Sequence, residues 1–125
     1  MIKNKSEYAD FKHRALLLCV QTNVREDAGV AEVYEGSRCA WCFNDLSRVK
    51  RAQIVVAVIH GVIREVFVAK EWLPVTVKNF PGHRAEPDRY GFNGAPAPAA
   101  IRDQYVGKRL SKKNRLYGPI GYVGF

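Results

Sequence analysis

Two apolar runs in the middle of the chain form the clearest hydrophobic pattern. The first reads Gln53-Ile-Val-Val-Ala-Val-Ile59, and the second reads Val62-Ile-Arg-Glu-Val-Phe-Val68. Both are rich in β-branched residues, which favour strands, and His60-Gly61 between them is a turn dipeptide. Two such runs around a short glycine-containing loop are typical of a β-hairpin. We therefore predict an antiparallel hairpin over residues 53–68, central to the sheet.

The first third of the chain predicts one strand and one helix. Residues 15–22 are apolar enough for a strand that is buried on both faces. From residue 28 to about residue 42 the apolar positions recur at helical spacing on one face, which carries Trp41. We expect this helix to lie across the sheet and residues 43–51 to form a polar connector.

The last part of the chain alternates between turns and short elements. Residues 75–100 are rich in glycine and proline and leave room for one short strand at 89–92. A short helix is predicted over 98–106, with proline in its first turn and Gly107 as its C-terminal stop. A basic stretch follows at 108–115, and 118–123 resembles a final strand.

Together these elements predict an α+β protein with a small curved or barrel-like sheet of about five strands and two helices. The length of 125 residues fits a single domain, 1–125, with residues 1–14 as a flexible N-terminal extension. Hydrophobic residues make up 47% of the chain and charged residues 26%, which is a globular composition. No apolar run reaches membrane-spanning length and no signal peptide is visible, so we expect a cytoplasmic protein without a membrane partner.

The charge is the strongest compositional signal. The chain has a formal net charge of +8, from 20 lysines and arginines against 12 acidic residues. Residues 1–100 hold 14 basic and 11 acidic side chains, whereas residues 101–125 hold 6 basic and 1 acidic. Such a basic segment attracts polyanions through phosphate neutralisation and counterion release. The alternative is a charged surface that serves only solubility.

Catalytic motifs are incomplete. There is no G-x-S-x-G, no phosphate-binding glycine loop and no clustered set of carboxylates for a divalent ion. Cys39-Ala-Trp-Cys42 has the spacing of a zinc half-site, which Cys19 and a histidine (His13, His60 or His83) could complete on paper. The alternative is that the thiols act as small apolar residues. We expect no catalytic residues, no metal and no cofactor, and lean towards a protein that is not an enzyme.

Binding features are better represented. Arg38 and Trp41 are three residues apart on the predicted helix, and Trp72 lies at the exit of the hairpin. With Arg89, these residues are candidates to stack on and contact a base, and we predict that the first three converge on one cleft. The alternative is that the aromatic rings belong to the core. Five residues of the basic stretch are candidates for backbone phosphate contacts: Lys108, Arg109, Lys112, Lys113 and Arg115.

The sequence also resembles a family of small uncharacterised bacterial and phage domains, from about residue 17 to the end. That family is similar to the PUA-like group (EVE, ASCH and YTH domains), whose small barrels bind RNA or read modified bases in a pocket. The chain departs from the pattern at Cys39 and Cys42 and in its proline- and glycine-rich loop 76–87. The strings of the resemblance are Val33-Tyr-Glu-Gly-Ser-Arg38 with Trp41, Arg48-x-Lys50-Arg-Ala52, residues 56–67 with Trp72, Arg89-Tyr-Gly-Phe-Asn-Gly94, residues 101–108 and Pro119-Ile-Gly-Tyr122.

The sequence therefore predicts a nucleic-acid-binding module, RNA or DNA, that reads a base, modified or not, in an aromatic pocket. One alternative is a protein-interaction module, such as a phage-encoded inhibitor of a nucleic-acid-binding partner. A small nuclease or base-modifying enzyme is the other. A fold resemblance does not choose among them, because function depends on the site.

Overall fold

The computed structural model of the chain describes residues 7–125, which form an α+β fold, as predicted. No helix in this range is long and apolar enough to cross a lipid bilayer. The elements within it are β1 (Ala15–Cys19), α1 (Val30–Ser37), α2 (Leu46–Lys50), β2 (Ile54–Ile59), β3 (Val62–Val75), β4 (Glu86–Pro96), α3 (Ala99–Tyr105), the 3₁₀ helix η1 (Lys112–Asn114) and β5 (Ile120–Val123).

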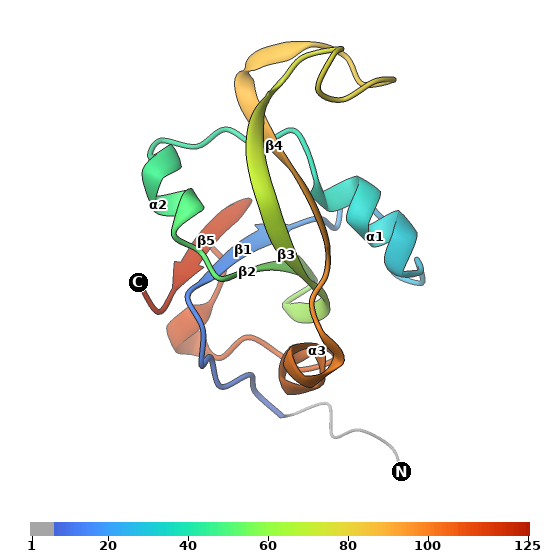
Figure 1. Cartoon of the computed structure of the whole chain (residues 1–125). Helices are drawn as coiled ribbons and strands as arrows, with labels where there is room; N and C mark the ends of the chain where they lie inside the picture. Colours follow the sequence, from blue (N-terminus) through green and yellow to red (C-terminus); the bar gives the residue numbers. More distant parts are fainter. Residues whose placement is uncertain (1–6) are drawn as a thin grey trace.

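The strands form one open, mixed sheet in the order β4-β3-β2-β1-β5 (Figure 1). β1 and β2 are parallel, and every other neighbouring pair is antiparallel. Parallel neighbours need a crossover connection, and α1 and α2 lie in the one that joins β1 to β2. The sheet therefore has β2 in its middle, with β4 and β5 as its edges.

The central hairpin is confirmed. β2 and β3 pair antiparallel, with Val55 opposite Phe67 and Ile59 opposite Val62. The turn consists of His60 and Gly61, whose φ angles are +50° and +76°. Two residues in the left-handed region match the twist of a tight hairpin, and glycine adopts this conformation without steric cost.

The core has two halves, one on each side of the sheet. Successive residues of a strand point to opposite faces, so β1 and β2 each supply both halves. Burial on both faces also explains why these strands are continuously apolar. One half includes Leu16, Leu18, Val55 and Ala57, with Val33 of α1 and Val49 of α2. The other includes Ala15, Leu17, Ile54 and Val56, with Tyr105 of α3.

The helices differ from the sequence prediction in number and length. α1 ends at Ser37, not near residue 42, because the backbone of Trp41 pairs with that of Tyr90 in β4 through two 2.8 Å hydrogen bonds. The predicted connector at 43–51 contains α2, so the described residues hold three α-helices where we expected two. Asp45 caps α2 by accepting a hydrogen bond from the backbone N–H of Arg48 at 3.2 Å.

The second hairpin is longer than expected. β3 continues past Trp72 through Pro74 to Val75, and β4 covers 86–96 where a strand over 89–92 was predicted. Pro74 lacks an N–H, and the register between β3 and β4 shifts directly after it. The hairpin extends beyond the rest of the sheet as an arm, with loop 76–85 at its tip (Figure 1).

The described part of the expected N-terminal extension packs against the end of α3. The backbone N–H of Ala9 donates to the carbonyl of Arg109 at 2.8 Å. The Tyr105 hydroxyl accepts from the backbone N–H of Lys12 at 2.8 Å, and Phe11 stacks on the Tyr105 ring. Residues 7–14 are thus held in place by contacts, while the remainder of the extension, residues 1–6, lies outside the described residues.

A buried ion pair fastens α3 to the sheet. Glu65 of β3 is 3% exposed, and its two carboxylate oxygens accept from Arg102 Nε at 2.5 Å and Nη2 at 2.8 Å. This bidentate geometry raises the pKa of Arg102 through the Glu65 hydrogen bond, so the guanidinium stays charged. Glu65 has no other cationic partner among the ion pairs of residues 7–125.

Replacing Arg102 with methionine should lower the free energy of unfolding by about 3 kcal/mol, because it leaves the Glu65 carboxylate buried and unpaired. We place the loss at the low end because Arg102 keeps a third of its side chain exposed. Arg102→Lys, which retains the charge but not the bidentate geometry, should lose less. Urea denaturation followed by circular dichroism measures both, and equal losses in the two variants would show that charge pairing is not the stabilising contact.

Candidate functional site

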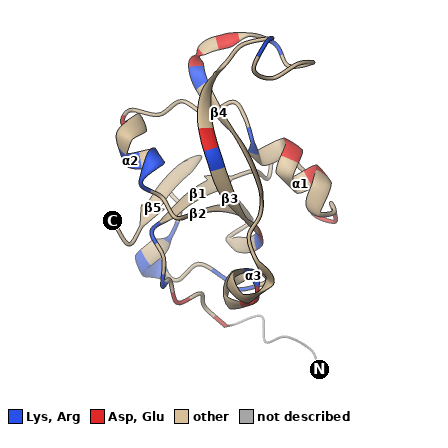
Figure 2. Ribbon diagram, in the orientation of Figure 1, with Lys and Arg blue, Asp and Glu red and all other residues tan. Residues whose placement is uncertain are grey.

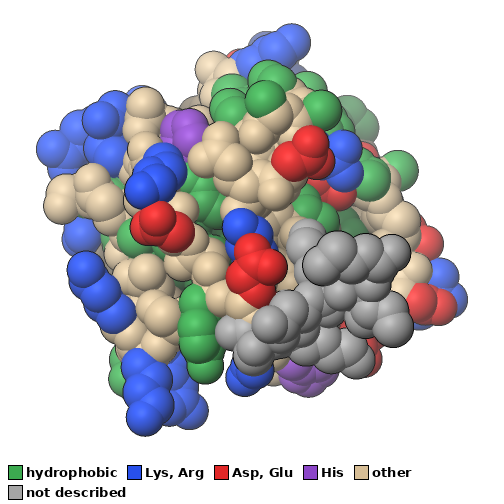
Figure 3. Space-filling model, turned by 90° about the horizontal axis from the view of Figure 1, so that it is seen from below, with side chains coloured by type: hydrophobic (Ala, Val, Ile, Leu, Met, Phe, Trp, Pro, Cys, Tyr) green, Lys and Arg blue, Asp and Glu red, His purple; other side chains and the backbone are tan. Residues whose placement is uncertain are grey.

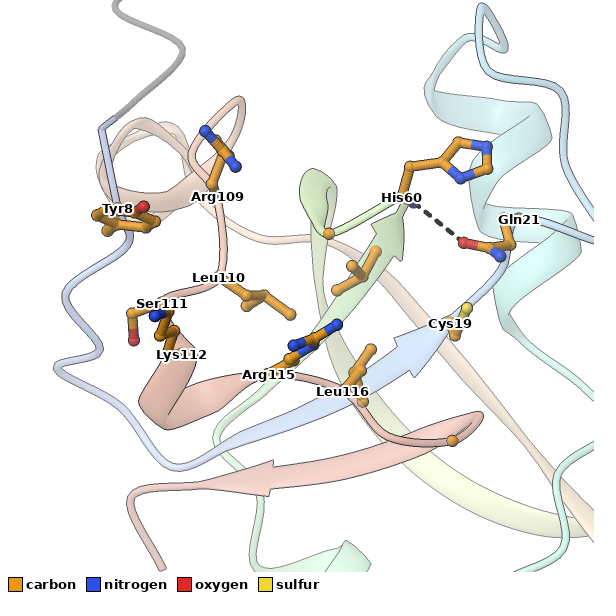
Figure 4. Close-up of a pocket in the computed structure, with 13 residues that line it drawn as sticks. Tyr8, Cys19, Gln21, His60, Arg109, Leu110, Ser111, Lys112, Arg115 and Leu116 are labelled. Atoms are coloured by element: carbon orange, nitrogen blue, oxygen red, sulfur yellow. Dashed lines mark hydrogen bonds between the residues drawn. The ribbon is translucent and has the colours of Figure 1, made fainter.

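A pocket of about 660 Å³ lies at the carboxyl ends of β1 and β2 (Figure 4). The carboxyl ends of parallel strands meet at one edge of a sheet, where ligands of open α/β sheets often bind. Cys19 and Gln21 line it from the end of β1, and His60 and Gly61 from the hairpin turn. The chain that follows α3, between Arg109 and Gly118, encloses the remaining side together with Tyr8. We call this the basic pocket.

The pocket is positively charged. Arg109, Lys112 and Arg115 line it, and its lining contains no carboxylate. Neither Lys112 nor Arg115 has an ion-pair partner within residues 7–125, and both are exposed. In Figure 4 the Arg115 side chain extends between Leu110 and Leu116 towards the middle of the pocket. Unneutralised cations around a concave surface raise the local concentration of anions.

Apolar and hydrogen-bonding groups complete the lining. Val58, Leu110 and Leu116 supply apolar wall. The Gln21 side-chain oxygen accepts a hydrogen bond from the backbone N–H of His60 at 3.1 Å, which orients the Gln21 amide at the rim (Figure 4). Apolar walls with a few convergent polar groups are typical of ligand sites.

Two exposed tyrosines lie beside arginines of the basic stretch 108–115. Tyr8 is 54% exposed, and the Arg109 guanidinium lies 5.7 Å from its ring centroid. Tyr117 is 88% exposed, and the Arg115 guanidinium lies 5.8 Å from its ring centroid. Exposed rings paired with arginine offer faces on which nucleic-acid bases stack.

The structure brings most of the predicted phosphate-contacting residues to this surface. Lys113 follows Lys112 in η1 but lines a neighbouring hollow instead of the basic pocket. Lys108 pairs with Glu7 at 2.9 Å and keeps 21% of its side chain exposed. Its charge is thus partly neutralised within the protein.

The two tryptophans lie together in the α1/α2 half of the core. Trp41 is 6% exposed, and its indole N–H donates to the carbonyl of Ser37 at 2.6 Å. Trp72 is half-buried, with its ring 5.0 Å from that of Phe92 and 5.3 Å from that of Phe43. In this arrangement Trp41 presents almost no surface on which a base could stack.

The two arginines predicted beside the tryptophans have partners within the protein. The Arg38 guanidinium lies over the rings of Tyr34 (5.3 Å) and Phe80 (5.2 Å) and donates to Asn93. Arg38 therefore ties the end of α1 to β4. Arg89, on β4, is nearly half exposed and lies 3.9 Å from Glu86. Neither arginine lines the basic pocket.

The cysteines do not assemble a metal site. In the described range no three His, Cys, Asp or Glu side chains are grouped so that they could share a metal ion. Burial raises the pKa of the Cys39 thiol, so at neutral pH it is protonated and behaves as a small apolar group.

Comparison of the chain with protein-family models, curated proteins and solved structures found no match. The chemistry of the basic pocket must therefore be inferred from its own residues. The sequence analysis did not name Tyr8, Gln21 or Tyr117 as site residues, and it named His60 only as a turn residue and a zinc-ligand candidate. Only Tyr117 carried a local signal, since it follows Arg115 by two residues.

Trp41→Phe should lower the free energy of unfolding by about 1–3 kcal/mol, because the carbonyl of the buried Ser37 loses its hydrogen-bond donor. If the tryptophan is a core residue, affinity for nucleic acid should stay within about twofold of wild type. Trp72→Phe, which removes no side-chain hydrogen bond seen within residues 7–125, is the matched control. A Trp41→Phe protein of normal stability with weakened binding would instead support the stacking role predicted from the sequence.

Proposed function

We propose that this protein binds nucleic acid through the basic pocket and the residues around it. The observation behind this proposal is the convergence of Arg109, Lys112 and Arg115 on a concave surface that lacks a carboxylate. Each phosphate that such a cation neutralises releases condensed counterions, which drives binding at physiological salt. A charged surface that served only solubility would not need three cations around one pocket.

The neighbouring tyrosines favour nucleic acid over other polyanions. Tyr8 and Tyr117 expose ring faces beside the arginines that would contact phosphates. Bases have apolar faces that stack on such rings, whereas sulfated or phosphorylated polymers without bases do not. The cations thus match the phosphate of a nucleotide, and the exposed rings match its base.

The sequence resemblance to PUA-like domains is a second support, because members of that group bind RNA or modified bases. We propose in addition that this chain belongs to the PUA-like group and that it reads a single base. In this chain the concave surface with convergent polar groups is the basic pocket, and so it is the place where we expect a base to enter. The Gln21 amide and His60 at its rim supply hydrogen-bonding groups of the kind that read base edges.

Replacing Lys112 and Lys113 together with alanine should reduce the salt dependence of binding. The slope of log K against log salt should become shallower by about 0.7 for each single-strand phosphate that is no longer neutralised, or by about 0.9 for duplex DNA. Fluorescence anisotropy with labelled RNA and DNA at several salt concentrations measures the slope. The matched control is Lys78→Ala with Arg84→Ala, two exposed cations in the distant loop 76–85. Equal slopes in both double variants would contradict the proposal.

Tyr117→Ala should weaken binding by about 1 kcal/mol or more if a base stacks on this ring. The salt slope should remain unchanged, because no phosphate-binding cation is removed. Tyr117→Phe keeps the ring face and should bind as the wild type does. Unaltered affinity in Tyr117→Ala would remove this tyrosine from the interface and leave the cationic residues to be tested separately.

A further inference from the structure

The 3₁₀ helix η1 is a ridge between two hollows. Lys112 lines the basic pocket on one side, and the next residue, Lys113, lines a second hollow of about 530 Å³. Tyr8 and Ser111 line both. The two concave surfaces are therefore neighbours, and consecutive lysines serve one each. We call the second hollow the β5 pocket, because Tyr122 and Val123 of β5 form part of it.

Beyond the β5 pocket, on the other face of the edge strand β5, an arginine stacks on aromatic rings. The guanidinium of Arg48 in α2 lies 4.0 Å from the ring centroid of Tyr122 and 5.4 Å from that of Phe125. Burial raises the pKa of the Tyr122 hydroxyl, so it remains neutral and adds no negative charge to the pocket. Tyr122 packs with the α1/α2 half of the core, whereas its neighbour Val123 packs with the other half, so Arg48 lies across the edge strand β5 from the pocket.

More cations surround this end of the surface. Lys50 and Arg51 are exposed at the end of α2, and Arg14 Nε donates to the carbonyl of Arg51 at 2.8 Å. None of the ion pairs within the described range involves Arg48, Lys50 or Arg51. The one carboxylate of the β5 pocket, Asp10, is paired with Lys12 at 2.9 Å.

Basic side chains are grouped on part of the surface. η1 and α2 carry basic positions, whereas α1, at the right of this view, carries acidic ones (Figure 2). Seen from below, lysine and arginine side chains line one side of the molecule (Figure 3). The basic pocket, η1 and the β5 pocket thus adjoin one another, and the cations of α2 lie beyond the edge strand β5.

From this arrangement we infer that one single strand of nucleic acid follows a path from the basic pocket, over η1, through the β5 pocket and around the edge strand β5 to Arg48. The inference rests on the proposed function and specifies its ligand. A single strand can bend over the ridge and enter both hollows. Duplex DNA is stiff, with a persistence length of about 50 nm, so it would span the hollows without reaching their floors.

The path predicts that affinity depends on strand length. Oligo(dT) and oligo(U) from about 3 to about 20 nucleotides are suitable probes, because single-strand sites on small domains cover several nucleotides. Affinity should rise with length until the strand reaches Arg48 and then remain constant. A hairpin duplex of equal charge should bind at least about tenfold more weakly than the long single strand.

Arg48→Glu tests the far end of the path. It should weaken binding of the long oligonucleotide by about fivefold to tenfold. The slope of log K against log salt should also become shallower, by about 0.7 for each phosphate that is no longer neutralised. Binding of the shortest oligonucleotides that still bind should be unchanged, because they occupy the basic pocket alone. Lys78→Glu makes the same charge change on the distant loop and is the matched control. If Arg48→Glu does not fold, Lys50→Glu provides the exposed alternative on the same helix.

The outcomes separate the inference from the proposed function. Weakened long-strand binding in Arg48→Glu but not in Lys78→Glu supports the path. Three results would overturn the path while leaving the basic pocket as the binding site. The first is an equal loss of affinity in Arg48→Glu and Lys78→Glu. The others are an equal loss for short and long strands in Arg48→Glu, and a wild-type preference for the duplex. Wild-type protein that binds none of these probes would overturn the proposed function itself.

Discussion

The parallel pairing of β1 with β2, buried on both faces, is the constraint on which the rest of this structure depends. An apolar strand in this position needs cover on both sides. The crossover that joins the two strands supplies α1 and α2 to one face, and α3 covers the other. Because the strands run in the same direction, their carboxyl ends meet at one edge, and the basic pocket forms there.

The basic stretch, residues 108–115, is held at that edge by hydrogen bonds of its backbone rather than by its side chains. The N–H of Leu110 donates to the carbonyl of Gly61 in the hairpin turn at 2.9 Å, and the N–H of Ile63 donates to the carbonyl of Lys108 at 2.8 Å. The N–H of Arg109 donates to the carbonyl of Glu7 at 3.0 Å. These bonds hold the segment without using the charged groups of Lys112 and Arg115, while the Glu65–Arg102 pair holds the preceding helix.

Some charged side chains of this protein are paired with one another, and others are left without an ion-pair partner in the described residues. Glu32 and Glu35 of α1 pair with Arg25 and Arg38, whereas Lys112 and Arg115 have no ion-pair partner within residues 7–125. Arg38 illustrates why an arginine beside aromatic rings is not by itself a binding residue. Its guanidinium lies over Tyr34 and Phe80 and donates to Asn93, and it links α1 with β4.

The sequence by itself determined the elements that local pattern specifies. The hairpin over 53–68 follows from β-branched runs around His60-Gly61, and α3 follows from its flanking Pro98 and Gly107. The basic character of 108–115 is equally local. Each of these depends on residues that are close together in the chain, so their propensities can be read directly.

Only the tertiary structure decided where α1 ends and what surrounds the basic stretch. Trp41 leaves the helical pattern because its backbone pairs with Tyr90, a distant residue that no local pattern connects to it. The basic pocket likewise combines Tyr8, the end of β1, the hairpin turn and the chain after α3. Long-range pairing and burial override local propensity, and they exist only once the sheet has formed.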